Sequence, residues 1–174
     1  MRRRMTALLL AFMMLSASAA CGTRTMGEGE GYRLYYLSVD SDRHGPALEG
    51  ELWQPEEEGT VPTAEELLRA LLEGPAGEEL RSPFPAGVSL IRVERDIDEP
   101  EKVRVRLSEA YSGLSDISLT LADYAIVLTL TQLDSVESVE IQANGYSANY
   151  RSHTQLKPEE ALLTDPLDAA DGFA

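Results

Sequence analysis

The chain has 174 residues, which is enough for one compact domain with tails and leaves little room for a second domain. Its composition, with 43% hydrophobic and 26% charged residues, is that of an ordinary globular protein and excludes a multi-span membrane protein. Its 15 Lys and Arg residues stand against 30 Asp and Glu residues, so the formal net charge is −15 at pH 7. Such a chain repels phosphate backbones and anionic lipid headgroups. No nucleic-acid partner is therefore expected, and any attachment to a membrane must be covalent or inserted.

The first 20 residues have the layout of a secretory signal peptide. Three arginines, Arg2, Arg3 and Arg4, precede an apolar run at residues 5–15, and small residues fill positions 16–20. The apolar run is shorter than the roughly 20 residues that a membrane-spanning helix needs. We therefore predict that residues 1–20 are a signal peptide that is removed.

Cys21 is the only cysteine, and it directly follows this segment. A disulfide within the chain and a thiolate metal cluster are therefore both excluded. The run Ser18-Ala19-Ala20-Cys21 resembles the lipobox of bacterial lipoproteins, although Ser18 stands where Leu is usual. The lipobox implies that Cys21 carries a diacylglyceryl group, which anchors the chain to the outer face of the cytoplasmic membrane. The alternative is cleavage by an ordinary signal peptidase, which would leave a free thiol in a secreted protein.

The mature chain begins with a Gly-rich segment at residues 21–31, which we predict to be a flexible tether from the lipid. The sequence favours β structure from Tyr32 onward. Residues 33–39 and 48–53 are predicted to form two strands, and the first of them contains Tyr35, Tyr36 and Val39. The polar residues 40–46 between them predict a turn.

A helix is predicted at residues 64–73, with leucines and alanine along one face. Thr63 and Glu66 have the spacing of a capping box, in which each side chain accepts a hydrogen bond from the backbone of the other residue. Gly74 and Pro75 predict the end of this helix, because Gly permits a left-handed cap and Pro prevents continuation.

The remaining predicted elements are strands at residues 88–93 and 102–107, a largely buried helix at 118–133 and a strand at 136–142. Asn144 and Gly145 close the domain, and residues 146–174 are predicted to form a weakly structured, acidic C-terminal extension. The order β-β-α-β-β-α-β predicts an α+β fold. We expect a single compact domain at residues 32–145, in which two helices pack on one face of a mixed sheet.

Residues 102–107 alternate between basic and apolar side chains. Because side chains of a strand alternate between the two faces of a sheet, Lys102, Arg104 and Arg106 are predicted to form a basic stripe on the outward face. One interpretation is pairing with outward acids of a neighbouring strand, such as Glu140. The other is a docking surface for an acidic partner.

The sequence shows no residue set typical of catalysis, so we expect no catalytic residue, metal or cofactor. His44 and His153 are the only histidines, and both fall in predicted loop or weakly structured segments. Residues 40–51 have acids at EF-hand spacing, but the segment joins two strands instead of two helices, so a polar turn is expected. One tryptophan and seven tyrosines leave open a glycan-stacking surface, although most of these residues suit a pleated sheet.

Four short sequence motifs follow one another in a particular order along the chain. They are LLEGP at residues 71–75, PAG at 85–87, TLTQ at 129–132 and VESVEI at 136–141 before Gly145. In this order, and after a lipoprotein signal, they resemble the GerMN domain over residues 32–145. These residues fit a helix cap, a turn into a strand, a buried helix and a last strand, and none of them carries a reactive group.

GerMN domains occur in bacterial envelope lipoproteins, including sporulation and germination proteins. The resemblance implies a non-enzymatic lipoprotein that binds or scaffolds another envelope protein, or a second copy of itself. A module that binds peptidoglycan or another cell-wall glycan is the alternative.

Overall fold

The structure is a computed structural model, and it describes residues 31–39, 46–57 and 59–151. The elements in chain order are β1 (Tyr32–Ser38), β2 (Leu48–Trp53), α2 (Ala64–Glu73), β3 (Leu80–Arg81), β4 (Leu90–Arg95), β5 (Lys102–Leu107), a 3₁₀ helix η2 (Glu109–Gly113), α3 (Asp116–Leu130), β6 (Ser138–Ala143) and β7 (Tyr146–Arg151). This arrangement confirms the predicted α+β class and the single domain with two α-helices.

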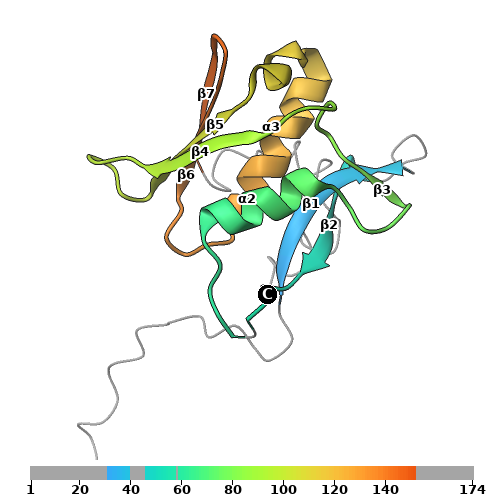
Figure 1. The fold of residues 1–174 in the computed structure, drawn as a ribbon, viewed down its shortest axis with the longest axis horizontal. Helices are drawn as coiled ribbons and strands as arrows, with labels where there is room; N and C mark the ends of the chain where they lie inside the picture. The colour runs from blue at the N-terminus through green and yellow to red at the C-terminus, as the bar shows by residue number, and fades with distance from the viewer. Residues whose placement is uncertain (1–30, 40–45, 58, 152–174) are drawn as a thin grey trace, which may run out of the picture. The chain divides into compact units, whose positions relative to one another are not determined.

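The strands divide between two sheets, whereas the sequence predicted one. The smaller sheet has the order β2-β1-β3 and is antiparallel. The larger sheet has the order β4-β5-β6-β7, in which only β5 and β6 run parallel. The two sheets lie on opposite sides of the helices (Figure 1). Pairing between strands depends on contacts that are distant in sequence, so the strand pattern alone did not reveal this division.

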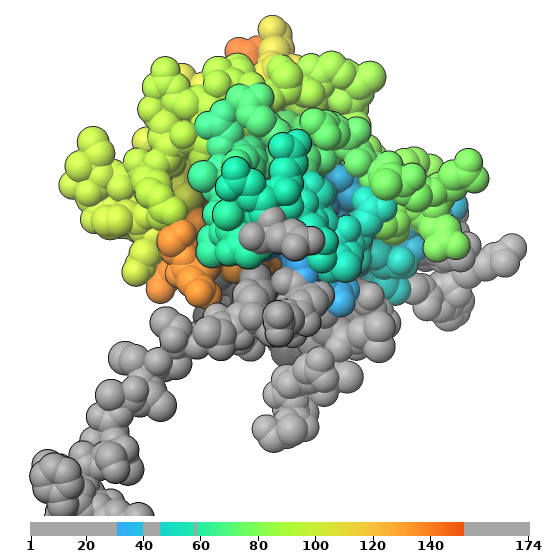
Figure 2. All heavy atoms as spheres, turned by 60° about the horizontal axis from the view of Figure 1, so that its bottom comes forward, coloured from blue at the N-terminus to red at the C-terminus, as the bar shows by residue number. Residues whose placement is uncertain are grey.

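Helix α2 begins and ends where the sequence predicts. The Thr63 backbone N–H donates to Glu66 Oε2 at 2.7 Å, and the Glu66 backbone N–H donates to Thr63 Oγ1 at 3.2 Å, which completes the capping box. Leu67, Leu68 and Leu71 are fully buried on its inner side. The outer side of α2 forms part of the molecular surface (Figure 2), as expected of an amphipathic helix.

Helix α3 is largely buried, as the sequence predicted, although its first turn at residues 116–118 is exposed. Its second half is enclosed without a break from Ala125 to Leu130. Ile126 and Leu130 belong to the main core cluster with both sheets, while Ala125 and Leu128 pack with Tyr35 and Leu48 of the smaller sheet. A helix that is apolar on every side must be covered on every side, and the two sheets together supply that cover.

Side chains at the end of α3 complete the hydrogen bonding of β1. The Tyr35 backbone N–H donates to Thr129 Oγ1 at 3.2 Å. The Gln132 carboxamide accepts from the Arg33 backbone N–H at 2.8 Å and donates to the Arg33 carbonyl at 2.6 Å. These bonds take the place of a neighbouring strand along the first half of β1. The second half of the same edge, at Leu37 and Ser38, pairs with β3. The TLTQ motif therefore joins the helix layer to the smaller sheet.

The C-terminal extension was predicted to start too early. Residues 146–151 form β7, which pairs with β6 through a hairpin turn at Asn144 and Gly145. Gly145 has a φ of 85°, a conformation that favours glycine in a tight turn. Tyr146, Ala148 and Tyr150 alternate with exposed residues, which is the pattern of a strand with one buried face. Residues 152–174 lie outside the described residues.

Replacement of Gln132 by Ala tests the bond between α3 and β1. Gln132→Ala leaves the Arg33 N–H and C=O without their partner, and we expect the free energy of unfolding to fall by about 2–4 kcal/mol. Gln132→Glu keeps an acceptor for the N–H but turns a carboxylate oxygen toward the carbonyls of Arg33, Leu128 and Thr129, so it should cost at least as much. Urea denaturation measures both, with the exposed Asn149→Ala as control. A loss for Gln132→Ala no larger than that of the control would contradict this role.

Candidate functional site

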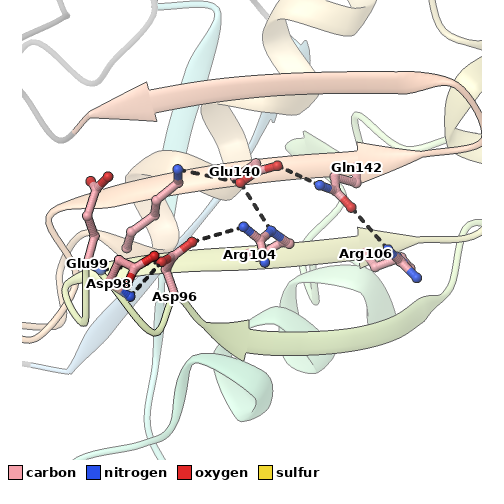
Figure 3. Close-up of polar contacts among 8 residues, drawn as sticks. Asp96, Asp98, Glu99, Arg104, Arg106, Glu140 and Gln142 are labelled. Atoms are coloured by element: carbon pink, nitrogen blue, oxygen red, sulfur yellow. Dashed lines mark hydrogen bonds and ion pairs between the residues drawn. The ribbon is translucent and has the colours of Figure 1, made fainter.

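The three residues of the predicted basic stripe lie together on the side of the larger sheet that no helix of residues 31–39, 46–57 or 59–151 covers. Lys102, Arg104 and Arg106 alternate along β5 with Val103, Val105 and Leu107, which are buried against the helices. We call this uncovered side the outer face. Figure 3 shows that the stripe meets polar side chains of β6 there, so that a row of hydrogen bonds and ion pairs crosses from one strand to the other.

Glu140 of β6 is the centre of this row. It lies directly opposite Arg104 in the parallel register and is only 8% exposed. Arg104 Nε donates to Glu140 Oε2 at 3.1 Å, and Lys102 Nζ lies 3.6 Å from the same oxygen. Gln142 Nε2 donates to Glu140 Oε1 at 2.5 Å. A buried charge is costly unless it is paired and hydrogen-bonded, and Glu140 is both.

Asp96 holds the other side of Arg104. Arg104 Nη2 donates to Asp96 Oδ2 at 2.9 Å, and the backbone N–H groups of Asp98 and Glu99 donate to Asp96 Oδ1 at 2.9 and 3.3 Å. Asp96 therefore fixes both the turn between β4 and β5 and the guanidinium of Arg104. In the sequence, residues 96–101 are recognisable only as an acidic segment that contains one proline.

The hydrogen bonds of this row also set the ionisation of its two acids. Burial raises the pKa of Glu140, but the hydrogen bonds from Gln142 and Arg104 and the charges of Arg104 and Lys102 outweigh burial and lower it below 4.5. The pKa of Asp96 is lowered by the backbone hydrogen bonds from Asp98 and Glu99, with a smaller contribution from Arg104. Because the pKa of each acid is lower in the folded protein than in the unfolded chain, the acids stabilise the fold at any pH above their ordinary pKa. This stabilisation is lost as the pH falls through the pKa of the folded protein.

Arg106 lies at the other end of the row and differs from the other two cations. It is exposed, and its Nη2 donates to the neutral Gln142 Oε1 at 3.3 Å. Its cross-strand neighbour is a second arginine, Arg92, whose Nη1 lies 2.6 Å from Glu94 Oε1. The cross-strand interpretation of the stripe thus describes Lys102 and Arg104, which have acidic partners, better than it describes Arg106.

A second polar cluster lies on the inner side of the larger sheet, and the sequence did not reveal it. Asp123 of α3 is 1% exposed and accepts hydrogen bonds from the hydroxyls of Tyr111, Tyr146 and Tyr150. Burial and the nearby Asp123 carboxylate together raise the pKa of Tyr146 to about 12 and raise the pKa of the other two further. The hydroxyls therefore remain donors at neutral pH, and they attach α3 to η2 and β7. The only available signal was a single acid in the middle of an apolar helix.

Several other predicted features lie outside the described residues. These include Cys21 with the signal peptide and most of the tether, and the histidines His44 and His153. Within residues 31–39, 46–57 and 59–151, no group of His, Cys, Asp or Glu side chains has the arrangement of a metal site. In the same part of the chain, no helix is long and apolar enough to cross a membrane.

These features define an α+β domain with helices between two sheets and a row of hydrogen-bonded charged side chains on the outer face of the larger sheet. The sequence model of the Germane family, described as sporulation and spore germination, matches residues 33–149. The chain therefore belongs to the Germane family, which confirms the predicted GerMN resemblance.

Solved structures from two bacteria are among those to which the chain is similar. The tandem GerMN domains of the sporulation protein GerM from Bacillus subtilis are 17% identical, with a TM-score of 0.47 over 67% of this chain. This chain spans only 40% of that tandem structure, but 85% of the first GerMN domain alone, at the same identity and TM-score. A protein from Clostridium perfringens described as a lipoprotein is 19% identical, with a TM-score of 0.44 over 68% of this chain and 85% of its own. No curated protein sequence gives a significant match.

Truncation of Glu140 and of Arg106 tests whether the centre of the row and its Arg106 end have different roles. Glu140→Ala removes the shared acceptor of Lys102, Arg104 and Gln142, so we expect it to reduce the free energy of unfolding by about 1–3 kcal/mol. Arg106→Ala removes an exposed side chain and should change it by no more than about 0.5 kcal/mol. Urea denaturation of both variants at pH 7 provides the measurement. Equal losses of unfolding free energy in the two variants would contradict the idea that Glu140 stabilises the fold and Arg106 does not.

Proposed function

We propose that this protein is a non-enzymatic envelope lipoprotein whose Germane domain docks another envelope protein through the outer face of the larger sheet. The observation that carries the proposal is that no helix within the described part of the chain covers this face, and yet its side chains are held in place. Its side chains are fixed by the Asp96–Arg104–Glu140–Gln142–Arg106 row, while both helices lie on the opposite side. A fixed array of charges on an open face suits recognition, because little side-chain freedom is lost on binding.

Membership of a family associated with sporulation and spore germination supports a role in the cell envelope. The N-terminal sequence supports the means of attachment, since Cys21 follows a secretory signal layout with lipobox-like residues. A diacylglyceryl anchor on Cys21 and the tether of residues 22–31 would hold the domain at the outer face of the cytoplasmic membrane. A docking function needs no cofactor, and it uses residue types that the outer face already presents.

The rival interpretation as a glycan-binding module draws little support from the aromatic residues. Tyr36 and Tyr111 are fully buried, Tyr32 and Tyr35 are 6% and 7% exposed, and the hydroxyls of Tyr146 and Tyr150 are bound to Asp123. Sugar binding of this kind needs exposed ring faces. The glycan alternative predicts that the protein sediments with purified sacculi, and docking to a protein does not require this.

Site-specific photo-crosslinking in cells tests the docking proposal. A photoreactive residue replaces Asn149, which is exposed on β7 and lies opposite Glu140 on the outer face of the sheet. A matched variant carries the same group at Arg69, on the exposed side of α2. We expect a discrete protein adduct at position 149 of the full chain and none at position 69. Adducts only at position 69, or none at either position, would contradict docking through the outer face.

Substitution of Cys21 tests the anchor separately. The thioether to the lipid requires the cysteine sulfur, so Cys21→Ser should move the mature protein from the membrane fraction to the medium. Fractionation of cells followed by immunoblotting measures the distribution, and Ser18→Ala is the control because it keeps the cysteine. Retention of Cys21→Ser on membranes would contradict lipid anchoring at this residue.

A further inference from the structure

The outer face offers three cations of the stripe, but they are not equally available to a partner. Lys102 and Arg104 share the carboxylate of Glu140, and Arg104 also binds Asp96. Their side chains are 20% and 32% exposed. A partner that recruited either cation would have to break ion pairs that support the fold. Arg106 has no such cost, since its side chain is exposed and donates its hydrogen bond to the neutral amide oxygen of Gln142.

The surroundings of Arg106 are also unfavourable for the free domain. Arg92 is its direct cross-strand neighbour on β4, and like charges that face each other across an antiparallel pair are destabilising. The pair of Arg92 with Glu94 relieves this repulsion only in part, because both side chains of that pair are about half exposed or more and solvent screens it. An additional anion next to Arg106 would offset the remaining repulsion between the two arginines.

A shallow hollow of about 550 Å³ opens beside Arg106, at the end of the outer face near the β6–β7 turn. Its lining includes Ile91, which is 59% exposed, together with Gln142 and Asn144. One acid, Glu109, also lines it and accepts a hydrogen bond from Asn144 Nδ2 at 3.1 Å. The hollow therefore combines a planar cationic group, amide groups and one exposed apolar side chain.

We propose that this hollow binds an acidic side chain of the partner protein, with an adjacent apolar side chain packed on Ile91. The guanidinium of Arg106 matches a carboxylate in a planar, two-bond geometry. This inference rests on the proposed docking function and names the chemistry that the partner must supply. A polyanionic wall polymer fits less well, because the net charge of −15 repels an extended polyanion, whereas one carboxylate needs only local attraction.

The test uses the full chain in cells, with the photoreactive residue at position 149 as the reporter. Arg106→Gln should lower the yield of the adduct by about tenfold, because a charge-assisted two-bond contact is lost. Arg106→Lys keeps the positive charge but lacks the planar guanidinium, so its adduct yield should lie between those of the unmodified chain and Arg106→Gln. Glu109→Gln should raise the yield, because it removes a competing negative charge from the hollow. Arg151→Gln is the matched control, as it removes an exposed cation from the other end of the same face and should change the yield by less than about twofold.

Mass spectrometry of the crosslinked peptide gives the second measurement. We expect a protein peptide that contains Asp or Glu next to an apolar residue. An adduct whose yield is the same with Arg106→Gln would overturn this inference while leaving docking intact. A polymer adduct, or a peptide without an acid, would overturn it as well. The absence of any adduct at position 149 in the unmodified background would overturn the docking proposal itself, and this inference with it.

Discussion

The constraint on which this structure depends is that α3 is apolar on nearly every side. A helix of this kind cannot lie on a single sheet with its back to water, so both of its sides must be covered. The smaller sheet covers one side through Tyr35 and Leu48, and the larger sheet covers the other through the core that includes Val103, Val105 and Ile141. Two sheets follow from this requirement. Strand β1 of the smaller sheet is buried on both faces, since Leu34 and Tyr36 belong to one core cluster and Tyr35 to the other. The larger sheet has an outer face that no helix of the described residues covers.

The uncovered face of the larger sheet is stabilised from within the chain. Glu140 is buried as a charge, and it is tolerated because Lys102, Arg104 and Gln142 all contact its carboxylate. The same contacts use most of the positive charge of the stripe. Arg106 lies opposite Arg92 and, among the described residues, donates to the neutral Gln142. Strand β5 thus carries, within five residues, two cations that stabilise the fold and one, Arg106, that is available to a partner. For recognition of a partner, the difference between Arg106 and the two paired cations therefore matters more than the total charge of the face.

Local signals predicted the parts of the fold that depend on local physics. The capping box at Thr63 and Glu66 and the Gly74-Pro75 stop gave α2 its bounds, and alternation gave the basic and apolar faces of β5. The division into two sheets depends on long-range pairing and was missed. Strand β7 was also missed, because the polar residues between Tyr146 and Tyr150 concealed the alternation after a recognisable Asn-Gly turn. For the site, the stripe was predicted, but its division required the positions of Asp96, Glu140 and Arg92, which the sequence alone does not provide.

The most direct test of this account is the labelling of arginine side chains by phenylglyoxal in native membranes and in the purified full chain. If the outer face is a docking surface, Arg106 should be labelled much less in membranes than after purification. Arg69 on the outer side of α2 should be labelled equally in both, since that surface faces solvent in either state. Equal labelling of Arg106 in membranes and in the purified chain would contradict the claim that a partner covers the outer face.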